Sequence, residues 1–248
     1  MSILWYKQQD GQRYEVRRAG QSLRLYTNGV FHSQYNPAQP VAGTIWDLLS
    51  LPAFALAPGR PRRVLVLGVG GGAVIRQLNH FFSPDLIVGI ELNPVHLILA
   101  RRFFDVEEKN VCLLEADALA WVDAYRGPAF DLVIDDLFGD SQGEPERAVS
   151  ADRNWSRALR RLLAPGGMLV MNFDSDAGLK QSALWSDPVL RRQWTDRQRF
   201  STPRYANQIA VFYFGRPDWA AFEERLQSHP ELDQRRSGCR LTYRRQRF

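Results

Sequence analysis

The residues best suited to chemistry in this sequence are glycines and carboxylates that follow short apolar runs. In "VLVLGVGGGAVIR", residues 64–76, branched apolar residues lead into Gly68, Gly70, Gly71 and Gly72, and a helical pattern follows. Glycine can turn tightly and let a ligand lie directly on the backbone. The start of the next helix presents free N–H groups and the positive end of its dipole. The stretch is therefore typical of a turn that lies against a bound ligand.

Two carboxylates follow the next two apolar runs. Glu91 stands 23 residues after Gly68, at a place where a carboxylate can accept both hydroxyls of a ribose. Asp117, in "EADA", follows the third run. It could accept from an adenine amino group, with Ala118 leaving room for the ring. The alternatives are a solvated strand-end acid for Glu91 and an N-cap of helix 118–125 for Asp117.

A further pair of acids ends the fourth run, "FDLVIDDLFGD". A carboxylate at the position of Asp135 or Asp136 can hold a cationic amine and take its proton before nucleophilic attack. Adjacent side chains on a strand point to opposite faces, so only one of the two can face a given reacting atom. The alternative is that these acids are simply solvated in a loop at the end of the strand.

The elements that must position these residues alternate along the chain. Short apolar strands are expected over 64–67, 86–90, 111–114, 131–134 and 168–172, with helical segments between them. Strands that alternate with helices of this length predict a Rossmann-like α/β fold, with a mainly parallel, doubly wound sheet covered on both faces. Such a sheet binds its ligand at the carboxyl ends of the strands, where the strand order reverses.

The opening of the chain has a different pattern. Strands are expected over 13–18, 22–27 and 30–35. The Asn28-Gly29 pair between the last two favours a type I′ hairpin turn. We therefore expect a β-rich extension over residues 1–58 and a nucleoside-binding domain over residues 59–248.

Composition limits the other classes of function. No run of 18 apolar residues predicts a membrane span, and the opening lacks the layout of a secretory signal. Two cysteines, Cys112 and Cys239, suit a reducing cytoplasm. The four histidines are scattered, so no metal site is expected. The net charge of +5 gathers near the C-terminus in "RRSGCRLTYRRQRF". We interpret this as a solvated tail, with a nucleic-acid contact as the alternative.

At these residues, from about Leu23 to Phe214, the sequence resembles the spermidine synthase family of aminopropyltransferases and its methyltransferase-like relatives. The motifs that carry the resemblance are "LGVGGGAV", Glu91, "ADA" at 116–118, Asp136 and the hairpin "LYTNGVFHSQY" ahead of them. The resemblance implies a class I methyltransferase fold and a transferase of polyamine biosynthesis. The implied donor is S-adenosylmethionine or its decarboxylated form, and the implied acceptor is an amine. It also favours Asp136 over Asp135 at the reacting centre, a cytoplasmic location and a homodimer.

The sequence departs from the family where the diamine would bind. Positions at which the family carries an acid, a Gln, a Tyr, a Glu and a second acid are occupied here by Gly71, His32, Thr44, Trp46 and Gly139. Other acids could restore some of the lost charge, namely Asp140, Glu144 and Asp174. The resemblance thus covers the nucleoside half and little of the diamine half, and we expect a poor spermidine synthase with putrescine.

Three alternatives stay open at this stage. The chain could be an S-adenosylmethionine-dependent methyltransferase of unknown, even nucleic-acid, substrate, or a non-catalytic protein that binds S-adenosylmethionine or 5′-methylthioadenosine. The spacing of Gly68, Gly70 and Ala73 also permits an NAD fingerprint. Against NAD, an acid after the third strand is more typical of adenosylmethionine enzymes.

Overall fold

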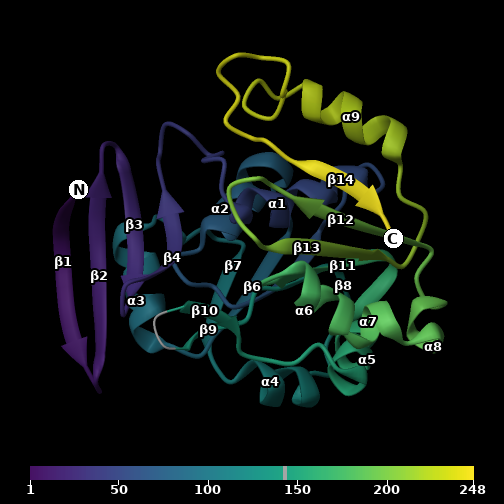
Figure 1. Cartoon of the computed structure of the whole chain (residues 1–248), viewed down its shortest axis with the longest axis horizontal. Helices are drawn as coiled ribbons and strands as arrows, with labels where there is room; N and C mark the ends of the chain where they lie inside the picture. Colours follow the sequence, from purple (N-terminus) through teal and green to yellow (C-terminus); the bar gives the residue numbers. More distant parts are fainter. Residues whose placement is uncertain (142–143) are drawn as a thin grey trace.

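Two sheets organise the chain in the computed structural model, which describes residues 1–141 and 144–248. A four-stranded antiparallel sheet at the N-terminus lies beside an eight-stranded mixed sheet (Figure 1). A small hairpin of two short strands, β9 (Phe138–Ser141) and β10 (Glu144–Arg147), stands apart from both. The mixed α/β architecture and the antiparallel opening confirm the predicted fold class.

The N-terminal sheet is a meander of neighbouring strands, β1 (Ser2–Gln9), β2 (Gln12–Ala19), β3 (Ser22–Thr27) and β4 (Val30–Tyr35). The three expected strands match β2, β3 and β4. Asn28 and Gly29 both have positive φ, 51° and 88°, as a type I′ turn requires. The prediction missed β1, because this edge strand is exposed along most of its length and lacks an apolar alternation.

The large sheet has the order β14-β12-β13-β11-β8-β5-β6-β7. Its parallel strands are β5 (Arg63–Leu67), β6 (Leu86–Glu91), β7 (Val111–Glu115), β8 (Phe130–Asp135) and β11 (Leu163–Phe173). Three antiparallel strands complete one edge: β12 (Asp196–Ser201), β13 (Gln208–Tyr213) and β14 (Arg244–Arg247). The chain leaves β5 for β6 and β7 on one side and then crosses to β8 and β11 on the other. This reversal places the switch point of the doubly wound sheet at β5.

Helices cover both faces of this sheet. One face carries α1 (Ile45–Ser50), the 3-10 helix η1 (Leu51–Ala55), α2 (Ala73–Phe82) and α9 (Trp219–Gln227). The other carries α4 (Ala118–Ala124), α5 (Arg153–Arg161), α6 (Asp176–Gln181) and α7 (Ala183–Ser186), with α8 (Pro188–Arg191) following. Strand β5 is buried on both sides, since Val64 and Val66 join one apolar cluster and Leu65 and Leu67 the other.

The two sheets are joined through α3 (Pro94–Phe103). Val95 and Leu99 of this helix pack with Tyr14, Val16 and Leu25 of the N-terminal sheet in a third cluster. Helix α1 and η1 instead pack into the core of the large sheet, in the cluster that also holds Val66. The division of the chain at residue 58 stays a prediction. Within the described ranges, no helix combines the length and the apolar character that crossing a bilayer demands.

Candidate active site

A cavity of about 890 Å³ lies at the carboxyl ends of β5, β6 and β8. This is the switch point of the sheet, the place where a doubly wound fold binds its ligand. The glycine turn and the ends of the strands form its floor. Hairpin turns of the N-terminal sheet and the β9–β10 hairpin border it from the sides.

The glycine turn is held in a conformation that only glycine adopts readily. Gly68, Gly70 and Gly72 have φ of +85°, +54° and +78°. A Cβ on Gly68 would lie 2.3 Å from the carbonyl oxygen of Asp136. Gly68 and Gly70 line the cavity. Gly71 and Gly72 are absent from its described lining. A Cβ on Gly71 would lie 2.7 Å from the Cβ of Ser33, and one on Gly72 would meet Val106.

Glu91 is buried beneath this turn at the end of β6. Its Oε2 accepts hydrogen bonds from the backbone N–H groups of Val69, at 3.0 Å, and Gly70, at 2.9 Å, and its Oε1 accepts one from Asn93 N, at 2.9 Å. Burial by itself would raise the pKa of this carboxyl. The neighbouring His96 and the backbone N–H groups outweigh burial and lower the pKa to about 2. Glu91 is therefore a fixed carboxylate on the cavity wall.

His96 stands in the first turn of α3 and was not predicted as a site residue. Its Nδ1 lies 3.7 Å from Oε1 of Glu91, an electrostatic contact rather than a hydrogen bond. Its Nε2 lies 2.8 Å from Oγ1 of Thr27 on β3, and its ring meets the ring of Tyr14 edge-on at 6.0 Å. Thr27 and Tyr14 lie far from His96 in the sequence, so no local pattern could have indicated these two contacts. All four of these side chains line the cavity.

Asp117 and Ala118 lie next to the end of β7. Asp117 Oδ1 accepts from the backbone N–H of Ala120 at 2.9 Å, so this residue is the N-cap of α4. This hydrogen bond agrees with the alternative interpretation of Asp117 as an N-cap. Both Asp117 and Ala118 nevertheless line the cavity. A carboxylate has about four lone-pair sites, so the capping bond leaves Asp117 able to accept another donor.

Asp136 lies on the other side of the switch point, directly after β8. Its Oδ1 accepts from Nδ2 of Asn172 at 2.7 Å, and Oδ1 of Asn172 accepts from Nδ2 of Asn207 at 3.0 Å. Burial raises the pKa of Asp136 to about 6; Asn172 and Arg147 oppose this rise, and the charges of Asp135 and Glu91 add to it. Asn172 is the last residue but one of β11, so the strand-end rule that found Asp136 could also have found Asn172.

Asp135 points away from Asp136, as alternation along β8 predicts. It is fully buried, and its Oδ2 accepts from Arg147, at 2.9 Å, and from Nε1 of Trp155, at 2.8 Å. Arg147 belongs to β10, so this buried ion pair fastens the β9–β10 hairpin to the large sheet. Asp135 is not among the lining residues. It supports one wall of the cavity from behind.

The end of the cavity beyond Asp136 is mostly apolar. Its walls come from β4, α1, the segment after β8 and the β12–β13 loop, and they include Phe31, Ile45, Trp46, Leu137, Phe138 and Tyr205. The ring of Phe31 meets Trp46 edge-on at 5.0 Å and stacks on Tyr26 at 5.2 Å. His32 also lines the cavity, whereas Thr44 donates its N–H to Asp47 at the start of α1.

The charge of the cavity contrasts with that of the whole chain. The protein carries a net charge of +5. Yet the charged residues in the described lining are all acids, Asp10, Glu91, Asp117 and Asp136, and none is Lys or Arg. Asp174 accepts from Ser175 Oγ and is not among these lining residues. The side chains of Asp140 and Glu144 fall outside the described residues. An acidic cavity of this kind suits cationic ligands.

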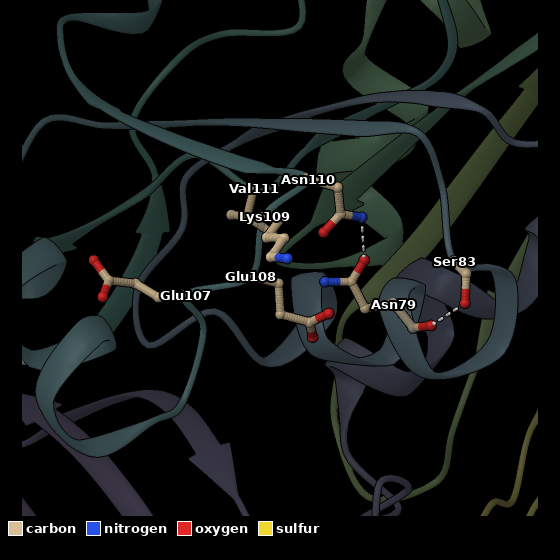
Figure 2. A pocket seen from close by; sticks show the side chains of 7 residues that line it. All are labelled: Asn79, Ser83, Glu107, Glu108, Lys109, Asn110 and Val111. Atoms are coloured by element: carbon tan, nitrogen blue, oxygen red, sulfur yellow. Dashed lines mark hydrogen bonds between the residues drawn. The ribbon is translucent and has the colours of Figure 1, made fainter.

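A second hollow of about 720 Å³ lies at the amino end of β7, on the side of the sheet opposite to the carboxyl ends of the strands (Figure 2). There Asn110 donates to Asn79 Oδ1 at 2.8 Å and to the carbonyl of Pro84. Ser83 donates to the carbonyl oxygen of Asn79. These polar groups bond one another and tie two loops together. The amino ends of the strands are also the edge that doubly wound sheets do not use for ligands.

The solved structures define the class of fold. A probable spermidine synthase from Corynebacterium glutamicum superposes with a TM-score of 0.75 at 18% identity, over 100% of this chain and 91% of that one. Human methyltransferase-like protein 13, in complex with SAH, gives a TM-score of 0.64 at 18% identity, over 80% and 95% of the two chains. The chain therefore has the fold shared by spermidine synthases and these methyltransferases.

The sequence comparison finds aminopropyltransferases and also a methyltransferase, the human eEF1A lysine and N-terminal methyltransferase, at 26% identity over 50% of this chain and 19% of that protein. The chain is 30% identical over 181 residues to the polyamine aminopropyltransferase of Mycobacterium tuberculosis, which is 70% of this chain and 33% of that protein. No family model matches. The chain spans about a third to a half of the length of the curated relatives first matched. The predicted resemblance to the aminopropyltransferases is confirmed.

Proposed function

We propose that the protein is a transferase that binds an adenosyl-sulfonium donor and passes an alkyl group from it to an amine. The observation that carries this proposal is the acidic cavity of a basic chain, placed at the glycine turn. Both reactants of such a transfer are cations, one a sulfonium and the other an ammonium. A cavity lined by carboxylates favours both, whereas it repels the pyrophosphate of NAD.

In this proposal the nucleoside lies across the ends of β5, β6 and β7. Glu91 accepts the ribose hydroxyls while it keeps its bonds to the glycine turn, because each carboxylate oxygen can accept more than one hydrogen bond. Asp117 accepts from the adenine amino group, and Ala118 leaves room for the ring. Gly68 and Gly70 let the nucleoside approach the backbone, while Gly71 and Gly72 keep the turn packed against its neighbours.

Asp136 is the proposed group at the reacting centre. Its carboxylate holds the acceptor ammonium and takes one of its protons, so that the amine nitrogen has a free electron pair. When bound, the donor supplies a carbon activated by the sulfonium. A nitrogen–carbon bond forms and the carbon–sulfur bond breaks, with its electron pair left on a neutral thioether. Asp136 then passes its proton to water. Holding nitrogen and carbon in line supplies much of the acceleration.

Methyl transfer from S-adenosylmethionine is a second candidate, favoured by the packing of Gly71. In the resembled family, an acid at this position holds the amine of the decarboxylated donor. Here a Cβ would already meet Ser33 and Phe104, so no acid fits without a rearrangement. Gly71 thus supports the donor that keeps its carboxylate.

The test has two steps. Mass spectrometry of the nucleoside that co-purifies identifies the donor, and calorimetry measures the affinity for S-adenosylmethionine, its decarboxylated form and 5′-methylthioadenosine. Each donor is then incubated with a panel of amines, and the alkylated product is quantified. A tightly bound nucleoside with no transfer to any amine would refute the transferase and favour a binding protein.

The setting of the protein forms part of the same proposal. Cys112 and Cys239 are both free thiols, which suits the cytoplasm. We expect a homodimer that acts on a small molecule without a metal ion, and sedimentation tests the dimer. Nucleic acid is an unsuitable acceptor, because the carboxylates of the cavity would repel its phosphates. Steeply salt-dependent binding of RNA or DNA would count against this expectation.

A further inference from the structure

The topology of the sheet places the acceptor end and the nucleoside end of the cavity on opposite sides of β5. From the switch point at β5, strands β6 and β7 lead to Glu91 and Asp117. Strands β8, β11 and β13 lie on the other side and bring Asp136, Asn172 and Asn207 together. Whatever reacts with a nucleoside bound on the first side must lie on the second.

The walls at this second end are largely aromatic. Trp46 is only 7% exposed, and its ring is fixed by the edge-on contact with Phe31 at 5.0 Å. Phe31 is in turn stacked on Tyr26. Phe138 and Leu137 approach from the segment that follows β8. A substrate that fills this space must offer apolar or aromatic surface to these rings, and a cation can also lie against an aromatic face.

Among the side chains that the structure describes, the carboxylates at this end can hold one ammonium. Within the described residues, Asp136 is the carboxylate here, and the amide of Asn172 is engaged with Asp136 and Asn207. Asp47 lies nearby in the sequence of α1, but it is buried behind the wall and accepts from Thr44 N and Gln77. Asp10 lines the cavity from the exposed β1–β2 turn, where water surrounds it.

We propose that the acceptor is a monoamine, with a single primary ammonium group on an apolar or aromatic body. The ammonium binds Asp136, and the body lies against Phe31, Trp46 and Phe138. This inference rests on the proposed transferase function and names its acceptor class. Because the described residues offer no second carboxylate at this end, a diamine would place its second ammonium against these rings, and a buried charge without a partner is strongly unfavourable. The alkyl group moves to the single nitrogen in the step described above.

The experiment compares three amines at a fixed donor concentration: 2-phenylethylamine, butylamine and putrescine. We expect kcat/KM for 2-phenylethylamine to exceed that for putrescine by roughly 10- to 100-fold, with butylamine between them, since the apolar wall rejects the second charge. Putrescine used as well as or better than 2-phenylethylamine would overturn the monoamine proposal and leave the transferase standing. No transfer to any amine, despite donor binding, would refute the transferase and this inference with it.

A variant pair tests whether the wall sets this preference. Trp46→Glu supplies a second carboxylate, and we expect the ratio of putrescine to 2-phenylethylamine turnover to rise by roughly tenfold or more. Trp46→Phe keeps an aromatic wall, and the three amines should keep their wild-type order of kcat/KM in this variant. Because Trp46 is buried, Phe138→Ala provides a second test. It should raise KM for 2-phenylethylamine several-fold and leave donor affinity unchanged. An equal loss of kcat/KM with all three amines in Phe138→Ala would contradict a role for the wall in choosing the acceptor.

Discussion

The nucleoside end and the acceptor end of the cavity are assembled in different ways. At the nucleoside end, Glu91 accepts hydrogen bonds from backbone N–H groups of the glycine turn, and Asp117 accepts one from the first turn of α4. At the acceptor end, Asp136 depends on Asn172 and Asn207, and the walls come from segments far apart in the chain. Carboxylates held by backbone N–H groups keep their partners when side chains change, because almost every residue type supplies the same N–H group. A site built from many segments can change its substrate while the fold and the donor stay the same.

The resemblance to the aminopropyltransferases follows a similar division. Glu91 and Asp117 at the nucleoside end belong to the shared motifs, whereas at the acceptor end Asp136 is shared but Trp46 and Gly139 stand where the family carries acids. Fold alone does not determine function. The two ends should therefore respond separately to mutation.

The largest effect is expected for Asp136→Asn. The variant keeps the volume and can still accept from Asn172, but it cannot take a proton. Turnover should fall by roughly 10²- to 10⁴-fold while donor affinity changes little. Steady-state assays and calorimetry measure the two quantities. If turnover survives in Asp136→Asn and collapses in Asp135→Asn, the wrong member of the pair was chosen.

Arg147→Met should cause the largest loss of stability. It leaves the buried carboxylate of Asp135 without its cation, which lowers the free energy of unfolding by about 3–5 kcal/mol. Urea unfolding measures the change. The matched control is Arg62→Met, which breaks the ion pair of two exposed side chains, Arg62 and Asp85, and should lower stability by less than about 1 kcal/mol. A similar loss in both variants would mean that the hairpin does not depend on the buried pair.

Substitution of Glu91 should affect the nucleoside end alone. Loss of its charged hydrogen bonds in Glu91→Ala should weaken donor binding by roughly 10- to 100-fold. Glu91→Gln can still accept from Val69 and Gly70 and so preserves the glycine turn. It should show an intermediate loss. Unchanged affinity in Glu91→Ala, measured by calorimetry, would remove Glu91 from the site. The relative use of different amines should not change in either variant.

The raised pKa of Asp136 predicts an effect of pH on stability. The pKa of Asp136 in the folded state is about 6, above the ordinary value of 3.8, so the folded state binds this proton more tightly than the unfolded state does. Protonated Asp136 therefore stabilises the fold at low pH. That contribution is lost as pH rises through 6, because the buried group must ionise. Asp136→Asn should therefore be more stable than the wild type at pH 8, by about 2 kcal/mol, and not at pH 4. Thermal unfolding at both pH values measures this difference. Glu91, with its pKa lowered to about 2, is common to both proteins and cancels.

The smallest effect is expected for Asp117→Asn. Asparagine is as good an N-cap as aspartate, so stability should stay within about 0.5 kcal/mol of the wild type. If its oxygen caps α4, its NH₂ group faces the adenine amino group, and two donors then oppose each other. Donor affinity should fall by roughly tenfold. Asp117→Ala, the control, should also lose about 1 kcal/mol of stability. Unchanged affinity in both variants would limit Asp117 to its capping role.

The sequence by itself determined the doubly wound sheet and the positions of its carboxylates. Strand periodicity placed Glu91, Asp117 and Asp136 after successive strands, and alternation separated Asp135 from Asp136. These features are local, because an apolar run, a glycine turn and the acid after a strand lie within a few residues of one another. The short strands β9, β12 and β14 were not predicted, since they have little apolar periodicity of their own.

Only the tertiary structure decided which groups meet across long distances. It paired Asp135 with Arg147, brought Thr27 to His96 beside Glu91, and set Phe31 against Trp46. It also turned Gly71 away from the cavity and against Ser33. The physical reason is that charge pairing, burial and aromatic contact depend on distances in space. Residues 69 positions apart can form a hydrogen bond that no local pattern encodes.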